Sequence, residues 1–206
     1  MNKYSLAALN KSNVIYHNLQ LIRHSVNELN YLLNHQTDGF LFSFAGYPSN
    51  YFTNLIDIHG RNIVVLFASL FEGDLSLEKL INYFESNIDK IEFKNKTINK
   101  SIMSKMIKES CGKYKNLKIT YYPIIKVNRD KIAAHQNAIN SHKSTELGDL
   151  IFSLEDMNNL LPKVEALFTN FYYSLTNEEY VIYQPKSFID EGLHALYDKK
   201  MKDLAK

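Results

Sequence analysis

The chain has 206 residues, of which 45% are hydrophobic, and its single cysteine excludes an internal disulfide and any CxxC metal or redox motif. Seven glycines and four prolines are few for a sheet-rich fold, and the apolar content suffices for one domain spanning residues 1–206. The chain lacks both a run of about 18 apolar residues and a signal peptide, so we expect a soluble, cytoplasmic protein without membrane contact.

The net charge of +2 is distributed unevenly. Residues 90–131 contain twelve Lys and Arg against three acidic residues, a net charge of +9, which leaves −7 for the rest of the chain. Aromatic residues are interleaved with these cations, a combination that suits RNA if the side chains share one face. An ordinary solvated helix surface explains the same charges about equally well.

The first predicted helix covers residues 5–35. Its apolar positions alternate at spacings of three and four, which places them on one side of a helix: Ile15, Leu19, Ile22, Val26, Leu29 and Leu33. The stripe indicates the core of a bundle, and a two-chain seam stays open as an alternative. Residues 36–50 follow as a predicted loop with glycines and three phenylalanines.

A second helix is predicted over residues 50–72, with Gly73 as its left-handed cap. Its second half is apolar on nearly every side, which indicates the most buried helix of the fold. Ser76 is a suitable N-cap for a third helix that ends near Asn87, and Leu75 is placed to pack on Leu80.

A lysine-rich fourth helix is predicted over residues 97–111, with Gly112 as its end. The fifth is expected to begin at Pro123, because proline is tolerated in a first helical turn and not in a helix interior. A polar linker, residues 136–145, follows it.

Ser153 and Asp156 form a predicted capping box for a sixth helix, residues 154–175, which Pro162 should kink or split. An extended piece at residues 180–183 and a last helix over residues 188–204 complete the chain. The sequence therefore predicts an all-α fold, a helical bundle of about six to seven helices.

Arg129 and His135 lie on the predicted fifth helix and are the strongest candidates for chemistry. A histidine can take a proton from a ribose 2′-hydroxyl and return one to the leaving 5′-oxygen, while an arginine binds the phosphate. This route cleaves RNA without metal, and neither a glycine-rich phosphate loop nor a metal motif is present, so we expect no cofactor and no metal site. Six residues on an ideal helix turn through about 600°, which leaves the two positions roughly 120° apart. Spacing alone favours an alternative, an arginine paired with Asp130 or another carboxylate and a histidine bonded in the core.

The run Arg129-Asp130-Lys131-Ile132-Ala133-Ala134-His135 resembles the signature of the HEPN superfamily, an arginine followed after four to six residues by a histidine. The order upstream is similar to the abortive-infection AbiU-like HEPN branch. It comprises a long first helix, a very apolar second one that ends at Leu70-Phe71-Glu72-Gly73-Asp74, and then Leu75-Ser76-Leu77-Glu78-Lys79-Leu80. The resemblance covers about residues 5–176 and leaves residues 177–206 as a C-terminal extension.

The resemblance implies a HEPN-like helical core and a homodimer in which both chains contribute to one cleft. Many relatives are metal-independent endoribonucleases of toxin–antitoxin or phage-defence systems. It would make Arg129 and His135 the catalytic pair, with Asp130 as an orienting residue. We further expect RNA contacts from four residues, which are Asn128, Lys131, Lys126 and Lys118. An antitoxin or another regulatory protein is an expected partner, although Asn137 stands where some relatives carry a modified tyrosine.

Two alternatives to the endoribonuclease stay open. One is a catalytically inactive HEPN bundle that binds nucleic acid or a partner protein, because a fold does not by itself carry an activity. The other is a helical bundle that binds a small molecule, in which the basic segment is merely solvated.

Overall fold

The structure, a computed structural model, describes residues 1–34, 50–139, 152–178 and 202, with the backbone alone at 50–53 and 134–139. Five helices and no strand lie within these residues. They are α1 (Lys3–Asn34), α3 (Asn50–Phe71), α4 (Leu77–Asn87), α5 (Lys100–Ile139) and α6 (Leu154–Thr176). The all-α prediction is confirmed. The predicted loop at 36–50, except Asn50 at the start of α3, lies outside the described residues. So do the extended piece at 180–183 and, except for residue 202, the helix at 188–204.

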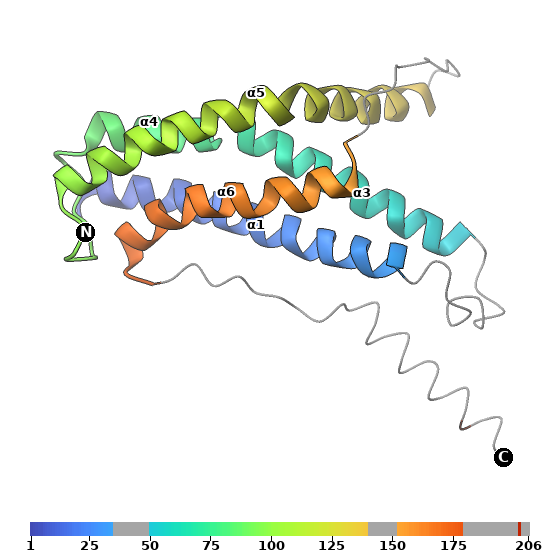
Figure 1. The fold of residues 1–206 in the computed structure, drawn as a ribbon, viewed down its shortest axis with the longest axis horizontal. Helices are drawn as coiled ribbons and strands as arrows, with labels where there is room; N and C mark the ends of the chain where they lie inside the picture. The colour runs from blue at the N-terminus through green and yellow to red at the C-terminus, as the bar shows by residue number, and fades with distance from the viewer. Residues whose placement is uncertain (35–49, 140–151, 179–201, 203–206) are drawn as a thin grey trace.

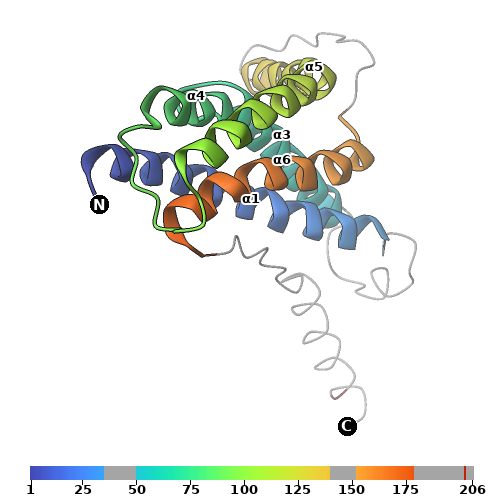
Figure 2. The ribbon, with the colours of Figure 1, turned by 60° about the vertical axis from the view of Figure 1, so that its left-hand side comes forward.

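The helices pack side by side as a bundle (Figure 1). α1 packs against both α3 and α6, and α5 packs against α3, α4 and α6 (Figure 2). α5 runs antiparallel to α6. It carries most of the basic segment and lies along one side of the bundle, with α1 on the opposite side.

α1 carries the predicted stripe toward the core. Ile15, Leu19 and Ile22 are fully buried, and Val26 and Leu29 nearly so, whereas Leu33 is half-buried. The helix begins after Asn2, whose side-chain oxygen accepts from the backbone N–H of Ser5 at 2.9 Å. This burial against α3 and α6 confirms the bundle-core interpretation of the stripe.

The connection between α3 and α4 has the two caps that the sequence predicted, Gly73 and Ser76. Gly73 has φ +88°, a conformation that glycine adopts without the strain of a side chain. The Ser76 side chain caps α4 by accepting from the backbone N–H of Lys79 at 3.4 Å. α3 is less enclosed than predicted, since Val65 in its apolar half is 47% exposed.

α5 corrects three predictions. It is one helix of 40 residues where two were expected, and it continues to Ile139 through the first residues of the linker predicted at 136–145. Gly112 does not end it, and Pro123 lies inside it rather than at its start. The buried side chains of Ile107, Tyr114 and Ile125 continue on one face across both residues, so packing holds the helix together. The predicted end at Gly112 and start at Pro123 were wrong because local propensity yields to this contact with the core.

α6 begins with the predicted capping box. The Ser153 side chain accepts from the Asp156 N–H at 3.1 Å, and the Asp156 carboxylate accepts from the Ser153 N–H at 3.0 Å. Pro162 does not split the helix; it is exposed, so its ring lies on the solvent side. In the described part of the chain, no helix has the length and apolarity needed to cross a membrane.

Candidate nucleic-acid interface and active-site residues

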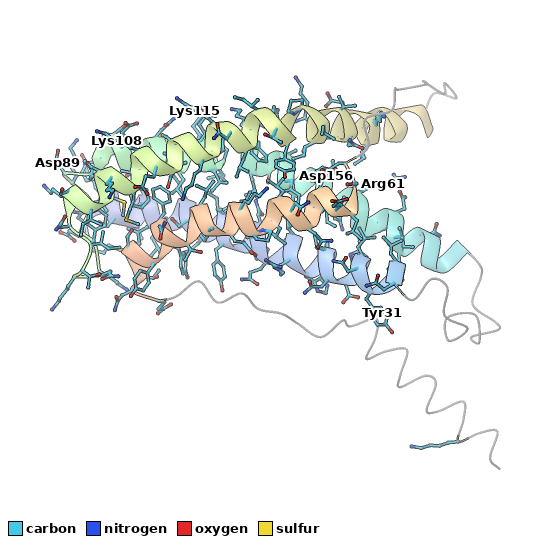
Figure 3. All side chains as sticks on the ribbon, viewed as in Figure 1. Tyr31, Arg61, Asp89, Lys108, Lys115 and Asp156 are labelled. Carbon is cyan, nitrogen blue, oxygen red and sulfur yellow. The ribbon has the colours of Figure 1, made fainter. Side chains whose placement is uncertain are left out.

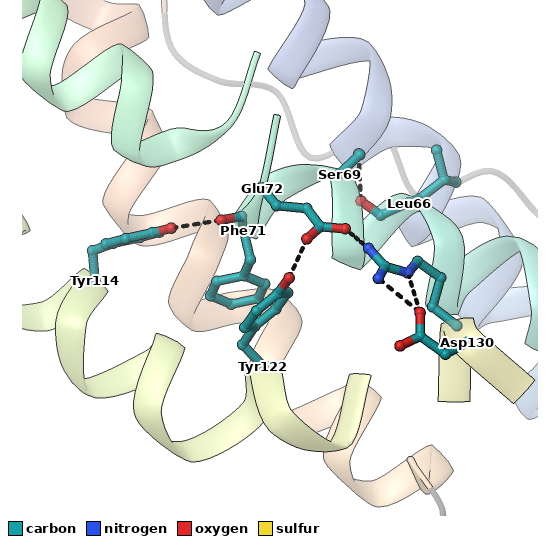
Figure 4. Close-up of polar contacts among 8 residues, drawn as sticks. Leu66, Ser69, Phe71, Glu72, Tyr114, Tyr122 and Asp130 are labelled. Atoms are coloured by element: carbon teal, nitrogen blue, oxygen red, sulfur yellow. Dashed lines mark hydrogen bonds and ion pairs between the residues drawn. The ribbon is translucent and has the colours of Figure 1, made fainter. Parts of the chain in front are cut away.

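Arg129 lies on α5 and is held by two carboxylates (Figure 4). Its Nη2 and Nε donate to Asp130 Oδ1 at 2.7 and 3.0 Å, and its Nη1 forms an ion pair with Glu72, the first residue after α3. The side chains of Arg129 and Glu72 are 28% and 39% exposed. The guanidinium is thus partly accessible to solvent, and it is already neutralised within the monomer.

Glu72 also accepts a hydrogen bond from the Tyr122 hydroxyl, so one carboxylate joins two residues of α5 to the end of α3. Burial, together with the negative charge of Asp130, raises the pKa of Tyr122 above its usual value. Tyr122 therefore stays neutral and acts as a donor. The arrangement fixes the part of α5 that carries Arg129.

A second cluster lies toward the start of α5. Lys118 Nζ contacts Glu78 Oε2 at 2.6 Å, and the buried Tyr114 donates to the Phe71 carbonyl at 3.1 Å. Burial, and next the charge of Glu78, raise the pKa of Tyr114. Lys118, predicted to contact RNA, therefore has a structural partner in the bundle.

Lysines also form a row on the exposed side of α5, where Figure 3 labels Lys108 and Lys115. Lys108, Lys115 and Lys126 are all exposed and are spaced by seven and eleven residues, which returns them to one face of an ideal helix. The row covers about 27 Å of the helix axis. The predicted RNA contact Lys126 is the last residue of this row.

The remaining predicted residues lie elsewhere on α5. Asn128 is half-buried, and its Nδ2 donates to the Ile124 carbonyl at 2.8 Å, one helical turn back. Lys131 is half-buried as well. His135 lies within α5, and its side chain is outside the described residues, so its distance from Arg129 stays a prediction.

The structure thus brings Arg129 and Asp130 together, and it adds Glu72 and Tyr122, which sequence reasoning missed. Glu72 was placed only as the end of a helix, and no local pattern connects it to an arginine on another helix. Glu72, just after α3, and Glu78 of α4 bind the α5 cations Arg129 and Lys118, whereas the row from Lys108 to Lys126 faces solvent.

Comparison with protein-family models, with curated proteins and with solved structures finds no match for this chain.

Proposed function

We propose that the protein binds RNA along α5 and cleaves it without metal, as a HEPN-type endoribonuclease of a toxin or phage-defence system. The observation that carries the proposal is the row of Lys108, Lys115 and Lys126 on the same helix as Arg129. Lysines aligned on one exposed face of a helix suit contact with several phosphates of one backbone. The row does not depend on the Arg129 and His135 spacing that first indicated RNA cleavage. Position 135 follows Lys126 by nine residues, two and a half turns of an ideal helix, so it lies on nearly the opposite side of α5 from the row.

In the proposed reaction the His135 imidazole removes the proton of a ribose 2′-hydroxyl. The 2′-oxygen attacks the adjacent phosphorus, the bond from phosphorus to the 5′-oxygen breaks, and the leaving oxygen receives a proton. The products are a 2′,3′-cyclic phosphate and a 5′-hydroxyl. Arg129 would stabilise the negative charge on the phosphate oxygens, and to do so it must exchange Glu72 for the substrate.

A homodimer is part of the proposal, since the angle between positions 129 and 135 favours a site built from two copies. Arg129→Ala and His135→Ala would each be inactive alone. Mixed and allowed to exchange subunits, they would recover about one quarter of wild-type activity if arginine and histidine come from different chains. The mixture would recover no activity if each chain supplied both the arginine and the histidine of its own site.

The alternative function is RNA binding without catalysis. The ion pairs of Arg129 with Glu72 and Asp130 favour it, because they give the arginine a structural role that needs no substrate. These ion pairs agree with the alternative that the spacing of Arg129 and His135 favoured, in which the arginine is paired with Asp130 or another carboxylate.

The deciding experiment incubates the full chain with end-labelled RNA and with DNA of the same sequence in the presence of EDTA. We expect cleavage of RNA alone by the wild type and by His17→Ala, which removes an exposed histidine of α1, and none by His135→Ala. Equal cleavage by His135→Ala and the wild type would exclude the proposed site. Salt-sensitive binding with no cleavage by the wild type would establish the non-catalytic alternative.

A further inference from the structure

An apolar groove lies between α5 and α6, away from Glu72 and the ion pairs of Arg129. It has a volume of about 350 Å³ and is lined by three residues of each helix, which are Lys113, Asn116, Leu117, Lys163, Ala166 and Leu167. Leu167 is buried and Leu117 half-buried, so together they form an apolar floor. Ala166 is exposed, and its short side chain leaves the groove open.

The two walls of the groove each carry a cation. Lys113 comes from α5 and Lys163 from α6, both are exposed, and no acidic residue is among the described residues that line the groove. The Lys163 Nζ donates to the Tyr121 hydroxyl at 3.3 Å and lies 5.5 Å from the centre of its ring. Tyr121 follows Leu117 by one turn of α5 and contacts the Lys163 wall, so its ring lies beside the groove rather than among the six lining residues.

These features fit a flat apolar group that has negative charge on both sides. An unpaired RNA base has this form, because its face stacks on apolar and aromatic side chains while the flanking phosphates attract lysines. A base in a duplex cannot enter, since its faces are covered by its neighbours. A fatty acid carries one charge at one end, which leaves the second wall without a partner.

The groove lies on the side of α5 that leads to position 135, about half a turn around the helix from the row of Lys108, Lys115 and Lys126, so an RNA strand that contacts both must cross α5. Position 135 follows position 117 by eighteen residues, which is five turns of an ideal helix and about 27 Å along its axis. Position 131 likewise follows Lys113 by eighteen residues and so lies on the same side of α5. A strand that leaves the groove along this side of α5 would reach Lys131 and then position 135.

We infer that the α5–α6 groove binds one unpaired base of the RNA strand. The inference depends on the RNA binding proposed above and adds the place where a base is held. Leu117, Leu167 and Tyr121 contact the base, and Lys113 and Lys163 contact the phosphates on either side of it.

The test measures binding of labelled 2′-O-methyl RNA, which the proposed reaction cannot cleave, by fluorescence anisotropy in EDTA. One oligomer carries bases and a second of equal length is abasic, so both have the same phosphates. We expect the wild type to prefer the first by about five-fold or more, the lower end of what one stacked base contributes. Ala166→Trp fills the groove from an exposed position and should reduce the preference to near one.

Ser101→Trp, an exposed position on α5 outside the groove, is the matched control and should keep the preference. Tyr121→Leu keeps apolar surface and removes the ring, so it provides a second measurement if Ala166→Trp does not fold. Undiminished preference in both folded groove variants would overturn the inference and leave the proposed RNA binding intact. Failure of the wild type to bind either oligomer would reject both proposals. Binding of oleate that Ala166→Trp abolishes, with RNA binding unchanged, would assign the groove to an anionic amphiphile instead.

Discussion

Glu72→Gln should increase the affinity of the protein for RNA. The glutamine keeps the shape of the side chain, and its carbonyl can still accept from Tyr122, while the negative charge that holds Arg129 is lost. Because a phosphate and Glu72 compete for the same guanidinium, removing the carboxylate makes Arg129 available.

The size of the effect follows from the exposure of the pair. With side chains 28% and 39% exposed, the ion pair is screened by water and should contribute about 0.2–1 kcal/mol. The substitution should lower the free energy of unfolding by that amount and tighten RNA binding by about 1.4- to 5-fold, which is the same energy expressed as an affinity ratio. Asp130 retains its contacts with Arg129 and keeps the gain within this range.

Affinity is measured by anisotropy with uncleavable single-stranded RNA at low salt, and stability by urea unfolding. Asp57→Asn is the matched control, because it makes the same change in net charge at an exposed ion pair with Arg61 on α3. If Glu72→Gln loses stability and yet binds RNA no better than Asp57→Asn, Arg129 does not bind phosphate.

Three further predictions concern stability. Arg23→Leu should lower the free energy of unfolding by about 3–5 kcal/mol in urea melts, because it leaves the buried Glu165 carboxylate without the guanidinium, while changing both residues to leucine should cost much less. Tyr114→Phe removes the hydrogen bond to the Phe71 carbonyl and should lower the free energy of unfolding by about 0.5–1.5 kcal/mol near neutral pH. Because burial raises the pKa of Tyr114, its stabilising effect is complete below the unfolded pKa of about 10 and is lost as pH rises beyond it, so wild-type stability should fall more steeply above that pH than that of Tyr114→Phe. Ser153→Ala removes the α6 cap and should cost about 0.5–2 kcal/mol by thermal or urea unfolding, and no loss would contradict the capping role.

The sequence predicted helix ends correctly where a single residue caps the helix. Gly73, Ser76 and Ser153 act through their own backbone or side chain, so the signal is local and the structure agrees with it. Gly112 and Pro123 carry equally familiar local signals, but α5 continues through both because buried residues on either side of them contact the core. That contact depends on other helices and is invisible in a short window of sequence.

The candidate site was predictable only in part. Arg129 beside Asp130 follows from adjacency, and their contact is confirmed. The pairing with Glu72 depends on how α3 and α5 pack, which no spacing rule specifies. The α5–α6 groove was missed for the same reason, since its walls are contributed by two helices and neither shows a distinctive pattern alone.

The short connection between α3 and α4 gives two charged contacts a common origin. Glu72 stands just before Gly73 and Glu78 just after the Ser76 cap, and the two carboxylates hold Arg129 and Lys118 on one helix. Substitutions at Glu72 and Glu78 should therefore be non-additive, with a coupling energy that a double-mutant cycle detects. A side chain at Gly73, strained at φ +88° although space for it is open, would shift both carboxylates together. The availability of two α5 cations is thus adjustable from a residue that contacts neither of them.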